Sequence, residues 1–281
     1  MSEAGPRPGL RAVSGARIAA ALTAELRTRI GEERFGLDGR LREWTDGLLP
    51  ELRALARGRG AGLDPHGLRV PWSPQALLAN SFLHWSGRGL PPLPGVDGRG
   101  ELHFQLRCPT GVRGAPPVVP VLAVGTTRVV AVLAAGPEAL LRRPRRLAMA
   151  YAETARKGPL ACWGRLALDA LAFRHVDVGA LFRLALALHA TFPDHHRTVL
   201  HLHLEPEDAG LFDATRRLRG KLAALAEALA GAPVRFAALS FLDLWRQWLE
   251  GGEGTARLAA RLLGRYAVRV APRLDGRRAS V

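Results

Sequence analysis

The stretch that decides the fold is GELHFQLRCPTGVRGAPPVVPVLAVGTTRVVAVLAAGPE, residues 100–138. It predicts three short strands, HFQLRC (103–108), PVVPVLAV (117–124) and RVVAVLAA (128–135), the last two joined by the tight turn at 125–127. Continuous apolar runs of this length, bounded by turn residues, are typical of strands buried on both faces of a sheet. Residues 117–137 contain no acid and only one charge, Arg128. The predicted strands therefore show no catalytic chemistry of their own.

Length and composition predict one large domain with a sizeable core, because the chain has 281 residues of which 48% are hydrophobic. The formal net charge of +15 favours polyanionic partners such as nucleic acid or an anionic membrane surface. Nearly all of this positive charge is arginine, since lysine occurs only at Lys157 and Lys221. An Ala, Leu, Gly and Arg-rich composition is equally typical of a GC-rich genome, so charge alone leaves both interpretations open.

Several protein classes are disfavoured by what the sequence lacks. Cys108 and Cys162 lie far apart without a CxxC spacing, which argues against a disulfide scaffold or a zinc ribbon. The chain shows no apolar run near the roughly 20 residues of a membrane helix and no signal-peptide pattern, so we expect a soluble cytoplasmic protein without a membrane partner. Neither a GxSxG elbow nor a phosphate-binding glycine loop occurs.

The N-terminal quarter predicts a helical extension over residues 15–70, preceded by a Pro/Gly-rich, disordered tail at 1–14. Ser14 is placed to cap a helix over about 16–34, whose apolar face carries Ile18, Leu22, Leu26 and Ile30. A second helix is expected over about 37–57, with a kink at Pro50.

The rest of the chain, 71–270, predicts one mixed domain, with a tail at 271–281. A short helix begins after Ser73 and precedes the three strands; a helical segment at 139–172, broken by prolines, and a buried helix at 178–190 follow them. Two further strands are expected at 198–206 and 234–240. A long helix at 207–230 joins them, with Glu207 and Asp208 at its positive end. A strand-helix-strand unit of this kind favours a parallel crossover and hence a mixed sheet.

This order of elements resembles the core of the PD-(D/E)XK nuclease superfamily, the restriction-endonuclease-like fold. From about Ser73 to Val268 the chain is similar to an uncharacterised bacterial group within that superfamily. The similar segments are SPQALLANSF (73–82), HFQL (103–106), VDVGALFRLALAL (176–188), TVLHLHLEP (198–206), FAALSFLDLWRQW (236–248) and LLGRYAV (262–268). The resemblance implies an α/β (α+β) fold: a mixed central sheet flanked by helices, with the N-terminal helices as an extension.

The resemblance also implies where catalysis belongs. Active members place an Asp on the second core strand and a Glu-x-Lys on the third, so that two acids hold Mg²⁺ and the lysine orients water or stabilises charge at the phosphate. These positions fall at Pro120, Leu133 and Ala135, none of which binds metal or polarises water. The expectation is a retained fold with a degenerate active site, and with no cofactor unless nuclease activity, and thus Mg²⁺, is retained.

Other positions of the family pattern are partly kept. The glutamine of the crossover helix falls at Ala180, while Arg183 keeps the basic position one turn later. Gln75 and Asn80 remain on the first helix, and Glu138 closes the third strand where the family often has a further acid. Candidate DNA contacts are Gln75, Arg183 and the basic run Arg142, Arg143, Arg145 and Arg146, which can equally be a solvated helix face.

Two further patterns have competing interpretations. His201, His203 and Glu205 alternate along a predicted strand, so they share a face and suit a transition metal such as Zn, Fe or Cu; the alternative is an ordinary half-buried strand. Trp245 and Trp248 favour a packing face over a base-stacking platform.

Three hypotheses follow. The first is a catalytically degenerate nuclease-like protein that binds DNA or assists a nuclease or defence system. The second is an interaction protein whose helices at 16–57 form a homodimer or partner surface, with the nuclease-like core as scaffold. The third is an active metal-dependent nuclease that uses displaced acids: Glu101, Glu138 or Glu153.

Overall fold

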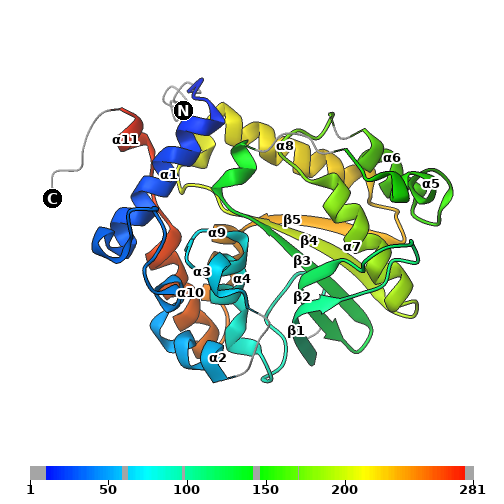
Figure 1. Ribbon diagram of the computed structural model, residues 1–281, viewed down its shortest axis with the longest axis horizontal. Helices are drawn as coiled ribbons and strands as arrows, with labels where there is room; N and C mark the ends of the chain where they lie inside the picture. Colours follow the sequence, from blue (N-terminus) through cyan, green and yellow to red (C-terminus); the bar gives the residue numbers. More distant parts are fainter. Residues whose placement is uncertain (1–10, 59–62, 97–98, 142–145, 170, 276–281) are drawn as a thin grey trace, which may run out of the picture.

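A five-stranded mixed sheet runs through the centre of the protein (Figure 1). The computed structural model describes residues 11–58, 63–96, 99–141, 146–169 and 171–275. The strands lie side by side in sequence order: β1 (Gly100–Arg107), β2 (Val118–Gly125), β3 (Arg128–Ala135), β4 (His196–His203) and β5 (Val234–Ser240). β1, β2 and β3 are antiparallel to one another, whereas β3, β4 and β5 are parallel. The predicted mixed sheet is confirmed.

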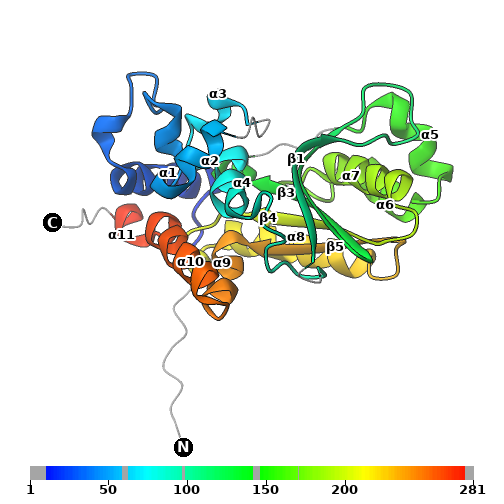
Figure 2. The same ribbon diagram turned by 90° about the horizontal axis from the view of Figure 1, so that it is seen from below.

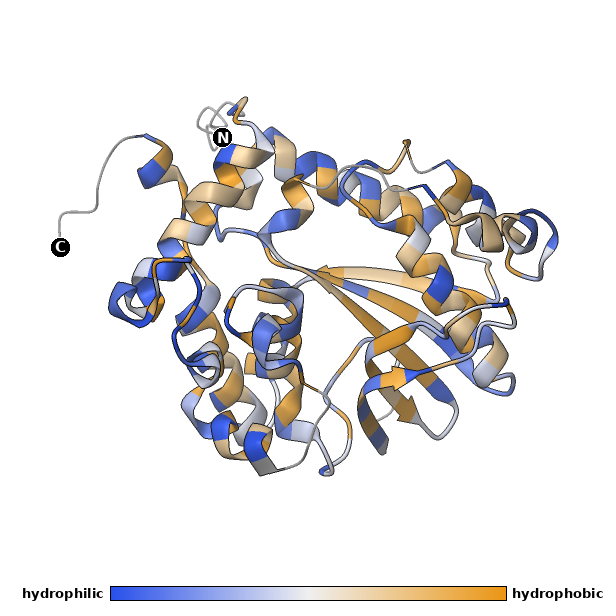
Figure 3. Ribbon diagram, in the orientation of Figure 1, coloured by the Kyte–Doolittle hydropathy of each residue, from blue (hydrophilic) through white to orange (hydrophobic). Residues whose placement is uncertain are grey.

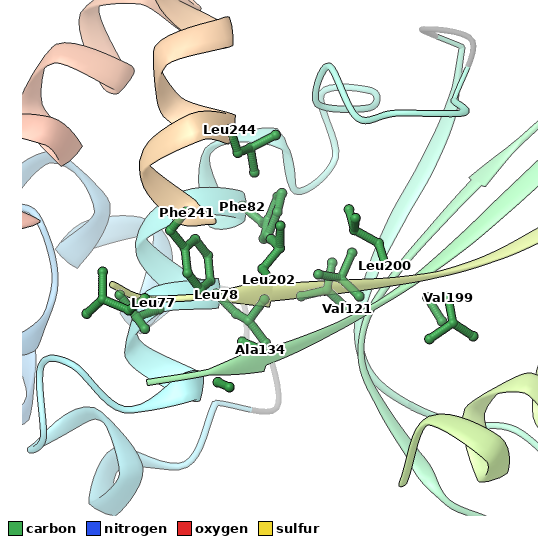
Figure 4. Packing of buried hydrophobic residues seen from close by; sticks show 14 of the residues in the cluster. Leu77, Leu78, Phe82, Val121, Ala134, Val199, Leu200, Leu202, Phe241 and Leu244 are labelled. Atoms are coloured by element: carbon green, nitrogen blue, oxygen red, sulfur yellow. The ribbon is translucent and has the colours of Figure 1, made fainter. Parts of the chain in front are cut away.

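Helices cover both faces of this sheet. α7 (Val178–Thr191) lies in the connection from β3 to β4, and α8 (Asp213–Ala228) lies in the connection from β4 to β5. Right-handed connections between successive parallel strands place both helices on the same face of the sheet. On the other face, Leu78 and Phe82 of α4 (Pro74–Phe82) and Phe241 and Leu244 of α9 (Phe241–Leu249) pack over the sheet, as Figure 4 shows. Apolar residues concentrate in the strands and on the helix faces turned toward them (Figure 3).

Shorter elements connect these layers. The remaining helices are α1 (Gly15–Ile30), α2 (Arg53–Gly58), α3 (Pro65–Leu68), α5 (Met149–Lys157), α6 (Ala161–Leu168), α10 (Glu253–Tyr266) and α11 (Ala271–Leu274). The 3-10 turns are η1 (Glu32–Arg34), η2 (Trp44–Gly47), η3 (Pro50–Leu52), η4 (Leu83–Trp85), η5 (Pro137–Leu141) and η6 (Ala209–Leu211). Among the helices of these described segments, none has both the length and the apolar character needed to cross a membrane.

The first helix is part of the main core. The Ser14 hydroxyl accepts a hydrogen bond from the Arg17 N–H, as expected of an N-cap. Ile18, Leu22 and Leu26 are fully buried and belong to the same hydrophobic cluster as the sheet. α1 contacts α10 and α11 at one end of the molecule (Figure 2). Its apolar face is therefore used inside the chain, which weakens the hypothesis that this face receives a partner.

The predicted helix at 37–57 is wrong. Between α1 and α3 the chain forms η1, η2 and η3 and only the short α2. Gly39 has a φ of +72°, which interrupts a right-handed helix, and Pro50 lacks the N–H that a helix interior needs. Leu37 is fully exposed, whereas Leu41 is buried in a small cluster with Ile30 and Phe35. The Leu41 N–H donates to the distant Arg69 carbonyl rather than within a helix.

The predicted start of the long helix at 207 is also wrong, because α8 begins at Asp213. Asp208 does not lie at its positive end. Its carboxylate accepts hydrogen bonds from the N–H groups of Val270 (3.1 Å) and Ala271 (2.8 Å), which ties the segment after β4 to the C-terminal segment. A local charge pattern could not reveal this distant partner.

Candidate functional site

The sheet opens into a fork where β2 and β3 separate. Their pairing runs from Val124↔Val129 to Val121↔Val132 and stops there, although β2 stays paired with β1 and β3 with β4. The next residue of β2 is Pro120, which has no N–H to donate to a ladder. Opposite it on β1, Gln105 has a φ of +53°, a conformation that non-glycine residues seldom adopt. The strands therefore bend apart at this row of residues.

A pocket of about 130 Å³ occupies the fork. Pro120 and Leu133 line it from the separating strands, and the amide side chains of Gln75 and Gln105 border it. The Gln75 amide nitrogen is buried and has no hydrogen-bond partner. The other lining residues are apolar: Leu63, Pro74, Leu78, Ala79, Phe104 and Ala134.

The structure brings together two of the three positions at which the resemblance places catalytic residues. Pro120 and Leu133 line the same pocket, while Ala135 is 1% exposed and pairs with His203. A metal-dependent phosphodiesterase site needs hard oxygen ligands close together. The fork presents apolar groups at these positions, so it lacks the chemistry of such a site.

The acids considered as displaced catalytic groups lie elsewhere. Glu101 pairs with Val124 near the hairpin turn, at the opposite end of β2 from the fork, and lies 3.5 Å from His103. Glu138 accepts a hydrogen bond from the Gly136 N–H (2.9 Å) and lines a groove against α1. Glu153 is exposed on α5. Across the described residues, no group of three or more His, Cys, Asp or Glu side chains is arranged to hold a metal ion.

One basic residue, Arg183, lines the second hollow of the fork. This hollow of about 450 Å³ shares Leu133 with the first pocket and is lined by Arg183, Tyr151 and the end of the β1–β2 loop. Arg107 and Arg113 are exposed in and beside that loop. No described acidic side chain lies within 4.0 Å of these three arginines. We call Arg107, Arg113 and Arg183 the fork arginines.

The predicted basic run falls mostly outside the described residues. Arg142, Arg143 and Arg145 lie there, and Arg146 is described and exposed. Sequence reasoning identified Arg183 but missed Arg107 and Arg113. Their only signal was their position near the end of a predicted strand and within the long loop that follows it.

Within the predicted metal set, Glu205 forms an ion pair with Arg219, and His203 lies beside its carboxylate. His201, His203 and Glu205 are 2%, 4% and 3% exposed, and the two imidazoles lie 6.0 Å apart. Both carboxylate oxygens of Glu205 accept hydrogen bonds from Arg219, one from Nε at 2.9 Å, and His203 Nε2 lies 3.6 Å from the same carboxylate. The Arg219 partner, which sequence reasoning missed, engages the oxygens that a metal would need.

The charge state of Glu205 follows from these contacts. Burial by itself raises the pKa of this carboxyl group, but the adjacent His203 imidazole and the hydrogen-bonded Arg219 guanidinium outweigh burial and lower the pKa from 4.5 to about 2. Glu205 is thus ionised at neutral pH. Its geometry is that of a structural carboxylate.

The tryptophan prediction is confirmed. Trp245 and Trp248 are 0% and 1% exposed. Their indole N–H groups donate to the Ser81 hydroxyl (3.1 Å) and to the Pro92 carbonyl (2.7 Å). Both rings therefore pack in the core and offer no platform for nucleobases.

Comparison of the chain with family models, curated proteins and solved structures returned no match.

Proposed function

We propose that this protein is a catalytically inactive restriction-endonuclease-like protein that binds duplex DNA through the fork arginines. The observation that carries the proposal is the composition of the fork. Pro120, Leu133 and Ala135 occupy the positions where the resemblance expects metal ligands and a lysine, while Arg183, which has no acidic neighbour, lines the same fork. Arg107 and Arg113, at the end of β1 and in the loop that follows it, are exposed and also lack an acidic neighbour. Loss of the metal site with retention of positive charge favours binding over cleavage.

The recognition chemistry is electrostatic. Guanidinium groups form paired hydrogen bonds with phosphate oxygens and are always charged. Arg107 is exposed at the end of β1, Arg113 is exposed in the β1–β2 loop whose end lines the second hollow, and Arg183 is half-buried on α7 in the lining of that hollow. Such contacts position a protein on the phosphate backbone without reading sequence, so we expect similar affinity for unrelated duplexes.

DNA binding should depend steeply on salt. If the three fork arginines each neutralise one phosphate, affinity falls about 40-fold between about 50 and 200 mM monovalent salt. Fluorescence anisotropy with a labelled duplex of arbitrary sequence measures this slope. Arg107→Gln and Arg113→Gln should each weaken binding and reduce the logarithmic slope by about 0.9.

A matched control is available on α10. Arg257 is exposed and bonded to Glu253 on the same helix, so Arg257→Gln removes the same charge away from the fork. Equal losses for this variant and for Arg113→Gln would show that net charge alone attracts DNA, and salt-insensitive binding would contradict the proposal outright.

The absence of catalysis is tested separately with a plasmid-nicking assay in Mg²⁺ and in Mn²⁺. We expect no cleavage above that of a chelator-treated sample. Cleavage lost both with chelator and in Glu138→Ala would instead establish an active nuclease with a displaced acid.

A further inference from the structure

A large hollow lies between α1 and the segment that runs through α3 into α4. Its volume is about 840 Å³, within the range of small-molecule sites. One wall is a stripe of small side chains along three turns of α1: Ala16, Ala19, Ala20, Thr23 and Ala24. The facing wall includes Val70 and Trp72, and Leu141, which is 53% exposed, borders the hollow. We call this hollow the α1 groove.

The α1 groove has two chemically different ends. At one end, Glu138 and Leu141 line the α1 groove from η5, which packs against the start of α1 near Gly15. Arg27 lies on α1 about 16 Å beyond Ala16, given the 1.5 Å rise per helical residue. An acid therefore lies near one end, and arginine lies near the other.

Arg27 is held in place without an acidic partner. Its guanidinium carbon lies 4.9 Å from the centroid of the Phe35 ring, and Phe35 in turn stacks on Trp72 with centroids 5.9 Å apart. The Arg27 Nε atom is buried and makes no hydrogen bond. By contrast, the half-buried Arg53 has an acidic partner, Asp46, at 2.9 Å.

Arg40 supplies a second positive charge at this end. Its guanidinium hydrogen-bonds the His66 ring, which must accept because arginine has only donors. Both Arg40 and His66 line the α1 groove. No acidic side chain among the described residues lies within 4.0 Å of the Arg27 or Arg40 guanidinium. Two arginines without an acidic partner thus face a hollow whose other lining is mostly apolar, with Thr23, His66, Ser73 and Glu138 as its remaining polar members.

From this arrangement we infer that the α1 groove binds a small, elongated organic anion with an apolar body. The carboxylate or phosphate head pairs with Arg27 and Arg40, and the apolar body lies along the alanine stripe against Trp72 and Leu141. Glu138 disfavours a second anionic group at the far end. α1 and α5 lie toward opposite ends of the molecule (Figure 1), and the α1 groove shares no lining residue with the second hollow of the fork, so this inference stands independently of DNA binding.

Calorimetric titration of the full-length protein with decanoate, kept below its micelle concentration, tests the inference. We expect saturable binding of one decanoate per chain, and binding of 1-decanol, the uncharged analogue of equal length, weaker by about tenfold or more. Absence of saturable decanoate binding, or equal binding of the acid and the alcohol, would overturn it.

Variants then locate the site. Arg27→Gln and Arg40→Gln should each weaken decanoate binding about tenfold. Ala20→Trp should abolish it by filling the α1 groove from an exposed position on α1, which leaves the core undisturbed. Arg235→Gln, which removes an exposed charge from β5, should change nothing. Full decanoate binding by Ala20→Trp, with a native circular dichroism spectrum, would place the ligand elsewhere and refute the assignment.

Discussion

Replacing Asn80 with alanine is expected to lower the free energy of unfolding by about 3–5 kcal/mol, because it leaves several buried polar groups without partners. Asn80 is completely buried. Its Oδ1 accepts from the Leu49 N–H at 2.7 Å, and its Nδ2 lies within 3.0 Å of the Gly47 carbonyl, the Ala76 carbonyl and the Tyr266 hydroxyl. Urea unfolding followed by circular dichroism measures the change.

Gln75→Ala provides the matched control, since it truncates another amide on the same helix. The Gln75 amide nitrogen has no hydrogen-bond partner to lose, so the expected cost is below about 1 kcal/mol. If Gln75→Ala and Asn80→Ala cost the same, loss of volume or helix packing would explain both, and the hydrogen-bond network would not be the cause.

The same network explains why the N-terminal segment is inseparable from the rest of the fold. Asn80 on α4 connects the backbone at 47–49 with Tyr266 on α10, and the Tyr266 hydroxyl donates to the Pro71 carbonyl at 2.8 Å. The resemblance alone would suggest a site residue at position 80. The contacts instead assign Asn80 a structural role, unlike Gln75, which reaches the fork.

Strand prediction succeeded where the local sequence suffices. The strand at 128–135 was predicted to the residue, because the uninterrupted run of Val, Ala and Leu between Arg128 and Gly136 has one favourable environment, the middle of a sheet. The helix at 37–57 failed although its leucines follow helical spacing. The backbone there bonds to distant partners, as the Leu41 N–H does to the Arg69 carbonyl. The backbone geometry of glycine and proline prevailed over the periodicity of the leucines.

The candidate site was only partly predictable for a similar reason. Pro120 and Leu133 were placed by the resemblance, and the structure brings both into one pocket. The left-handed Gln105 opposite Pro120 arises only once β1 and β2 have adopted their register. Arg219 likewise lies 14 residues beyond Glu205, on a different element, so no local pattern joined them.

The second large effect is expected at Glu205, where Glu205→Gln should lower the free energy of unfolding by about 3 kcal/mol at pH 7. The neutral amide resembles the protonated carboxyl group, and the pKa of Glu205 is lowered from 4.5 to about 2. Each pKa unit corresponds to about 1.4 kcal/mol, which gives the predicted size. Chemical denaturation of both proteins at pH 7 measures the difference.

The pH dependence of this difference separates the charge from the packing. Because the folded-state pKa is the lower one, the folded protein binds fewer protons than the unfolded chain between pH 4.5 and 2. The stabilisation is therefore complete above pH 4.5 and is lost as pH falls through about 2. We expect the stabilities of the native protein and Glu205→Gln to converge over this window.

Glu253→Gln is the control for this titration. Its carboxylate is 86% exposed and pairs with Arg257 on one helix turn, so its loss should cost less than about 0.5 kcal/mol at any pH. A difference for Glu205→Gln that stays constant from pH 7 to pH 2 would show that the amide disturbs packing. A difference that closes only for Glu205→Gln would establish that its ionised carboxylate, held by Arg219 and His203, stabilises the carboxyl end of β4.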